Sequence, residues 1–141
     1  MSKSEDTTRA TKLDNPLDTV LSGASRFAIE VVAWVAGPWA AADLTGNWLM
    51  TIPALAILVA LPGVFSTTGD KKHVVVAVPG PVRLLIEIFL AVVAIASAAI
   101  VWTFIGGIIV TVVAAIMFVA GAKRAKWLFS NKPPRWPSPS D

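Results

Sequence analysis

The longest apolar run in the chain, residues 82–122, sets the strongest constraint on the fold. As one helix, its 41 residues would extend about 60 Å at about 1.5 Å per residue, roughly twice the hydrocarbon core of a bilayer. The run must therefore fold back on itself. We place the turn at residues 103–107, where two glycines relax the backbone, and predict helices over 82–102 and 106–122.

Two shorter apolar segments precede this run, at residues 27–42 and 48–65. The chain is 55% hydrophobic and 15% charged, whereas average soluble domains carry about 25% charged residues. These numbers predict an all-α, polytopic membrane protein with four transmembrane helices. Because Gly37 and Pro38 interrupt the first segment, we expect a kink or an early helix end there.

The polar parts of the sequence divide the chain further. Residues 25–122 form the predicted transmembrane domain, with a cytoplasmic loop at residues 66–81. Residues 1–24 are a polar tail that we expect to be mostly disordered. Residues 123–141 are a basic, proline-rich tail.

The basic residues predict the orientation. All 12 Lys and Arg residues fall on one side of the predicted membrane, in the two tails and around the middle loop, and Asp43 is the only charge on the other side. The positive-inside rule then puts both termini in the cytoplasm of a multi-pass inner (plasma) membrane protein. Tryptophans near the predicted span ends fit an aromatic belt (Trp39, Trp48, Trp102 and Trp127).

A charged motif occurs twice, 57 residues apart. The stretch "SRFAIEVV" carries Arg26 and Glu30, and "VRLLIEIF" carries Arg83 and Glu87 at the same spacing. This match favours a parallel internal repeat of two similar hairpins related by a pseudo-two-fold axis along the membrane normal. A chance match between Ala/Val/Ile-rich helices is the alternative.

Three interpretations of the charged pairs remain open. Arginine and glutamate four residues apart share one helix face, so each pair can act as an interfacial anchor that binds head groups. With the pseudo-two-fold, Arg26 instead reaches Glu87 and Arg83 reaches Glu30, which would lock the hairpins together. In the third interpretation the glutamates are transport carboxylates, although the adjacent arginines keep them ionised and occupied.

Small residues at four-residue spacing predict close helix packing. We favour packing within the bundle over an interface with another chain. The residues are Ala33, Gly37 and Ala41 in the first span, Ala94 and Ala98 in the third, and Gly107, Thr111 and Ala115 in the fourth.

Basic residues beside the predicted inner ends of the spans indicate contact with anionic lipid. They are Lys71, Lys72, Lys123, Arg124 and Lys126, with Trp127 beside them. In the middle loop, the stretch "HVVVAV" at residues 73–78 predicts a short extended run able to pair with another edge, or an apolar stretch lying on the interface.

The chemistry that the sequence lacks also narrows its function. The chain has no cysteine, and its one histidine, His73, lies in a polar loop. It has no glycine-rich phosphate loop, zinc-binding pattern or serine elbow. We therefore expect no catalysis, cofactor or bound metal, and no nucleic-acid partner.

With these spans and charges in place, the chain resembles the YrdB-like family of small four-helix membrane proteins. The resemblance covers about residues 24–122 and rests on "RFAIE" and "PVRLLIE" at the starts of the first and third spans. It implies the fold and a membrane location, since the family has no established biochemical function. The longer N-tail, middle loop and basic C-tail depart from the family and hint at a contact with a partner.

Together these features predict a non-enzymatic integral membrane protein. We expect an accessory or scaffold subunit that packs against a larger membrane assembly, with an envelope lipid transporter as one candidate. Its partners would be membrane lipids and a larger complex or a homo-oligomer. The alternative is a small oligomeric transporter or lipid-binding module that uses Glu30 and Glu87.

Overall fold

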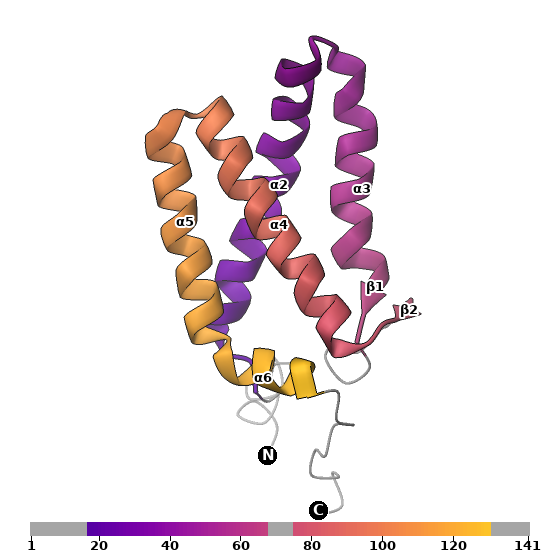
Figure 1. The fold of residues 1–141 in the computed structure, drawn as a ribbon, viewed down its shortest axis with the longest axis vertical. Helices are drawn as coiled ribbons and strands as arrows, with labels where there is room; N and C mark the ends of the chain where they lie inside the picture. The colour runs from indigo at the N-terminus through magenta and orange to yellow at the C-terminus, as the bar shows by residue number, and fades with distance from the viewer. Residues whose placement is uncertain (1–16, 68–74, 131–141) are drawn as a thin grey trace, which may run out of the picture.

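The computed structural model describes residues 17–67 and 75–130, which are mostly helical (Figure 1). The helices are α2 (Val20–Thr45), α3 (Thr51–Val64), α4 (Gly80–Val101), α5 (Thr103–Ala120) and α6 (Ala122–Ser130), with a short 3-10 turn, η1 (Trp48–Met50), before α3. Two helical hairpins cross each other, and a short helix lies across the end of the bundle where α2 begins and α5 ends. Two strands of two residues each, β1 (Phe65–Ser66) and β2 (Val76–Ala77), complete the described part.

Three helices, α2, α4 and α5, are long and apolar enough to cross a membrane, with 26, 22 and 18 residues. The stretch Trp48–Val64, which contains η1 and α3, is also apolar but shorter. Large apolar side chains are exposed along all four of these helices, as expected for a surface that faces lipid. The predicted helical character is therefore confirmed, with three helices long and apolar enough to cross a membrane.

The first helix is longer than the sequence predicts. It begins at Val20 because the side chain of Thr19 caps it, accepting a hydrogen bond from the backbone N–H of Ser22 at 3.0 Å. It continues through Pro38, so the expectation of an early end there is wrong. The helix ends at Thr45 because Gly46 adopts a left-handed conformation (φ 63°) and caps it.

The turn between α4 and α5 comes earlier than the predicted residues 103–107. Trp102 separates the two helices, and Thr103 has a φ of 77°. The two glycines lie inside α5, where they allow close contact with α4. A Cβ added to Gly107 would lie 2.9 Å from the Cβ of Ala99, closer than side chains normally approach.

The two hairpins have matching turns. Among the described residues, Gly46 and Thr103 are the ones with positive φ, and they are 57 residues apart. This is the spacing that relates Arg26 to Arg83. For a β-branched residue such as Thr103 the left-handed region is strained, whereas glycine adopts it freely.

The hairpins differ in how their second helices pack. Helices α2 and α4 cross at the centre, and α5 packs against both of them. Helix α3 packs mainly against α2 and hardly contacts α4. The core between the helices is built from small and branched residues, among them Ile29, Ala33, Leu90, Ala94 and Ala98.

The segment after α3 pairs with the end of the middle loop. Strand β1 is parallel to β2, with Phe65 opposite Val76 and Ser66 opposite Ala77. The predicted extended run is thus confirmed at Val76–Ala77, whereas residues 73 and 74 lie outside the described residues. The pairing holds the end of α3 close to the start of α4.

Helix α6 packs across the start of α4 through a glycine contact. A Cβ added to Gly80 would overlap the backbone carbonyl of Leu128. Leu128 is itself 1% exposed. Because Leu128 is packed in place, Gly80 cannot be replaced by a larger residue unless α6 moves.

We expect Gly80→Ala to lower the free energy of unfolding by about 1–3 kcal/mol, because the added methyl overpacks the contact with α6. Gly23→Ala is the matched control, since Gly23 occupies the equivalent repeat position and no atom lies within 4 Å of an added Cβ. Its effect should be neutral or slightly stabilising, because alanine favours helix. Unfolding titrations in mixed detergent–SDS micelles measure both variants, and equal effects would contradict the contact.

Candidate functional site

A buried cluster of arginines surrounds Glu87, in the second turn of α4. Its Oε1 lies 3.5 Å from the Nε of Arg26 on α2 and 3.5 Å from the Nε of Arg83, one turn earlier on α4. Arg124 reaches it from α6 with both terminal nitrogens, Nη2 to Oε1 at 2.9 Å and Nη1 to Oε2 at 3.1 Å. Glu87 is 5% exposed, so one buried carboxylate joins three helices.

Arg83 connects this cluster to a fourth helix. It is fully buried, and its Nη1 donates to the backbone carbonyls of Pro62 at 3.4 Å and Phe65 at 3.2 Å. Carbonyls at a helix C-terminus lack partners within the helix. Arg83 therefore caps the end of α3 and ties it to α4.

Arg26 extends the cluster toward the start of α2. Its Nη1 lies 3.0 Å from Oδ2 of Asp18, and its Nη2 donates to Oδ1 at 3.2 Å. The same Nη2 donates to the hydroxyl of Ser22 at 3.2 Å. A bidentate arginine–carboxylate pair fixes the orientation of both side chains, so Arg26 is held between Asp18 and Glu87.

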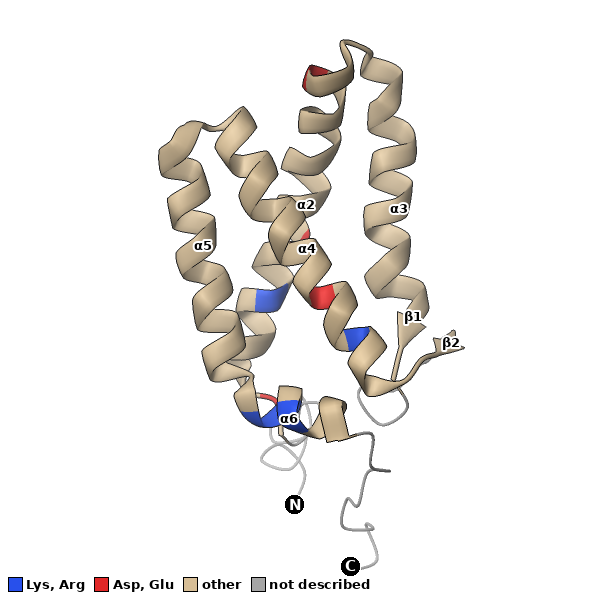
Figure 2. Cartoon of the chain, in the orientation of Figure 1, with Lys and Arg blue, Asp and Glu red and all other residues tan. Residues whose placement is uncertain are grey.

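The charges of the cluster nearly balance. The carboxylates of Asp18 and Glu87 offset most of the charge of the three arginines. Burying an unpaired charge costs several kcal/mol, and a buried ion pair compensates that cost only when its geometry is good. Arg26 and Asp18 share two hydrogen bonds, and Arg124 and Glu87 share one hydrogen bond and a second close contact, which helps these charges to lie inside an apolar bundle. Figure 2 shows these charges gathered toward the end of the bundle near α6.

The two repeated motifs have different environments. Arg26 contacts Glu87 across the helices, as in the second interpretation of the charged pairs. Arg83 contacts Glu87 within its own helix. Glu30 is half-buried and takes part in a polar interaction, whereas Glu87 is buried. The two repeated glutamates therefore differ in burial.

Arg124 lies where the sequence analysis does not expect it. The sequence groups it with residues that contact anionic lipid, but it is 3% exposed and pairs with Glu87. Arg124 and Leu128 are four residues apart and so lie on the same face of α6, and both are buried. This spacing is the sequence signal that could have placed Arg124 on the inward face. Lys123 and Lys126 are exposed and Trp127 is half-buried. Lys71 and Lys72 lie outside the described residues.

The predicted packing residues divide into two groups. Ala33, Gly37, Ala94, Ala98 and Gly107 are buried, and Ala41 is half-buried. Thr111 and Ala115 are exposed instead, and the Thr111 hydroxyl donates to the Gly107 carbonyl at 2.8 Å. Helix α5 turns another face inward, formed by Gly107, Val110, Ala114 and Met117.

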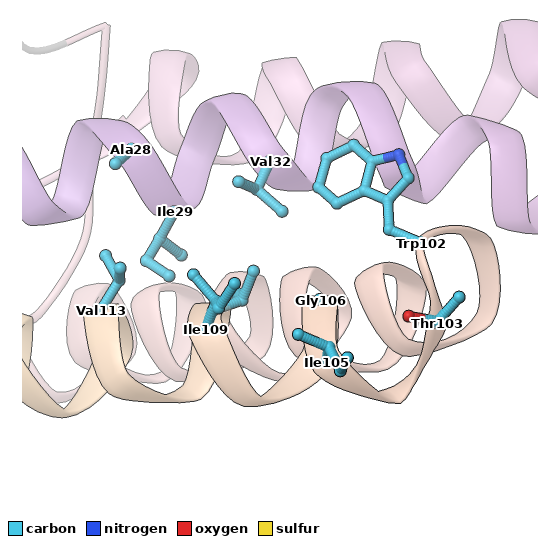
Figure 3. A pocket seen from close by; sticks show the side chains of 10 residues that line it. Ala28, Ile29, Val32, Trp102, Thr103, Ile105, Gly106, Ile109 and Val113 are labelled. Carbon is cyan, nitrogen blue, oxygen red and sulfur yellow. The ribbon is translucent and has the colours of Figure 1, made fainter.

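The helix bundle also has apolar grooves on its surface. The one in Figure 3 lies between α2 and α5 and has a volume of about 500 Å³. Ile29 and Val32 face Ile109 and Val113 across it, and the ring of Trp102 extends from the α4–α5 turn toward α2. Such a lining accepts an apolar group, and its only hydroxyl belongs to Thr103.

The described residues hold no group of three or more His, Cys, Asp or Glu side chains suited to a metal ion. Comparisons with known protein families, with curated proteins and with solved structures found no match.

We expect Glu87→Gln to lower the free energy of unfolding by about 3 kcal/mol or more, because it leaves three arginines, two of them buried, without their shared carboxylate. Asp43→Asn is the charge-matched control, since Asp43 is exposed at the opposite end of α2. That change should stay within about 0.5 kcal/mol. Chemical unfolding of the purified protein in mixed micelles compares the two variants. Similar stabilities would show that Glu87 does not hold the helices together.

Proposed function

We propose that this protein is a non-enzymatic membrane scaffold, an accessory subunit that packs against a larger membrane assembly. In this proposal α2, α3, α4 and α5 all cross the inner membrane as two similar hairpins, and both termini are cytoplasmic. The distribution of basic residues supports the orientation. The resemblance to the YrdB-like family is part of the same proposal.

The packing of α3 is the observation that carries the proposal. Of its 14 residues, only Leu58 and Pro62 are buried. Its counterpart α5 packs against both central helices, whereas α3 packs mainly against α2. The remaining faces of α3 are apolar and leave room for a helix of a partner. That helix would pack against α3 as the two central helices pack against α5.

The charged cluster supports a structural role over transport. A coupling carboxylate must release and rebind a proton or an ion during each cycle. Glu87 instead contacts three arginines, two of them from other helices. Glutamine at both Glu30 and Glu87 should therefore reduce expression or stability. Loss of a transport activity at constant expression would favour the transporter alternative.

An assembly partner can be detected by purifying the tagged protein at natural expression level in mild detergent. We expect a larger membrane protein to co-purify in constant ratio. Ile57→Trp on α3 should weaken that association, because Ile57 is 57% exposed and a bulky ring there prevents close helix packing. Ile108→Trp on α5 is the matched control, since Ile108 is 48% exposed on the other hairpin. Purification of the protein alone, or equal effects of the two variants, would contradict the proposal.

A further inference from the structure

A second apolar groove lies at the end of the bundle next to α6. It has a volume of about 480 Å³ and lies between the start of α2 and the last turns of α5. Its last lining residue, Ala120, ends α5 and is three residues before Lys123. The lining is entirely apolar and consists of Leu21, Val112, Ala115, Ile116, Val119 and Ala120.

The outward face of α6 is basic. Lys123 and Lys126 are exposed and, three residues apart, share one side of the helix. Arg124 and Leu128 occupy the opposite, buried side. The charged residues of α6 are all basic, and Phe129, 71% exposed, adds an apolar side chain to the outward part. Exposed lysines beside an exposed aromatic ring are typical of a helix at a membrane interface.

The apolar residues around the groove indicate how deep this end of the bundle lies. Val20 is 71% exposed in the first turn of α2, and Val119 is 78% exposed in the last turn of α5. In a membrane-embedded bundle such side chains belong in or next to hydrocarbon. Lys123 comes four residues after Val119, at the start of α6, so in a membrane-embedded bundle its side chain would reach the level of the lipid head groups.

We propose that the corner between α5 and α6 binds an anionic phospholipid. One acyl chain would lie in the groove that Val119 and Ala120 help to form, and the head-group phosphate would contact Lys123 and Lys126. Arg124 takes no part, because it forms an ion pair with Glu87. The proposal rests on the membrane embedding proposed above. A soluble acidic protein would not account for the apolar groove, whose lining ends at Ala120, three residues before Lys123.

Native mass spectrometry of the full-length protein in mild detergent, with added phosphatidylglycerol or phosphatidylcholine, tests the site. The wild-type protein should retain phosphatidylglycerol preferentially. Lys123→Gln with Lys126→Gln should lower that preference about 25-fold, at about fivefold for each lysine near an anionic head group. Arginine at both positions should restore it, because the charge is kept.

Ala115→Phe tests the groove separately, since it fills the groove from an exposed position. It should reduce retention of both lipids. Ala96→Phe is the matched control on α4, exposed and away from this groove, and should leave retention unchanged. Thermal unfolding of each variant verifies that it is folded.

An unchanged lipid preference in the double glutamine variant would overturn the proposal, as would equal effects of the two phenylalanine variants. Polyglutamate that competes with phosphatidylglycerol for the lysines in wild-type protein and in Ala115→Phe alike would also overturn it, in favour of an acidic protein partner. Release of the protein from membranes by alkaline carbonate would overturn both this site and the membrane embedding. A lipid preference without any co-purifying complex would support this site and count only against the scaffold.

Discussion

The ion pairs of Glu87 determine how the rest of the structure is assembled. One carboxylate in α4 is within ion-pair distance of arginines from α2, α4 and α6, and one of these, Arg83, also binds the end of α3. Apolar helices in lipid gain little from the hydrophobic effect when they associate, because lipid tails are as apolar as their side chains. Directional polar contacts and close packing must therefore select one arrangement. In this bundle Glu87 supplies the polar contacts, and the small residues of α2 and α4 supply the packing.

Helix α6 depends on the same carboxylate. Arg124 holds the helix to Glu87, and Gly80 lets its backbone approach the start of α4. These two contacts turn α6 across the end of the bundle instead of continuing the direction of α5 (Figure 1). The two lysines of α6 are exposed, and Lys123 comes three residues after Ala120, the last residue of the apolar groove, as the proposed lipid site requires.

The sequence predicted the features that depend on local pattern. Hydropathy located the apolar helices, and the spacing of 57 residues between Arg26 and Arg83 is also the spacing between Gly46 and Thr103 in the two hairpin turns. The predictions from the sequence were wrong where a residue's position depends on contacts between helices. Gly106 and Gly107 were assigned to the turn because glycine relaxes the backbone, but they serve the contact between α4 and α5. A periodic pattern also could not reveal that Arg124 pairs with a glutamate 37 residues earlier, nor that Glu87 would contact arginines from three helices.

A double-mutant cycle between Glu87 and Arg124 tests most directly whether this ion pair holds the bundle together. The free energies of unfolding of Glu87→Gln, Arg124→Gln and the double variant are compared with that of the wild type. We expect the double variant to be more stable than the sum of the single effects implies, with a coupling of about 1–3 kcal/mol, as found for residues in direct contact. Effects that add within about 0.5 kcal/mol would mean that the two side chains act independently, and would contradict the central role of Glu87.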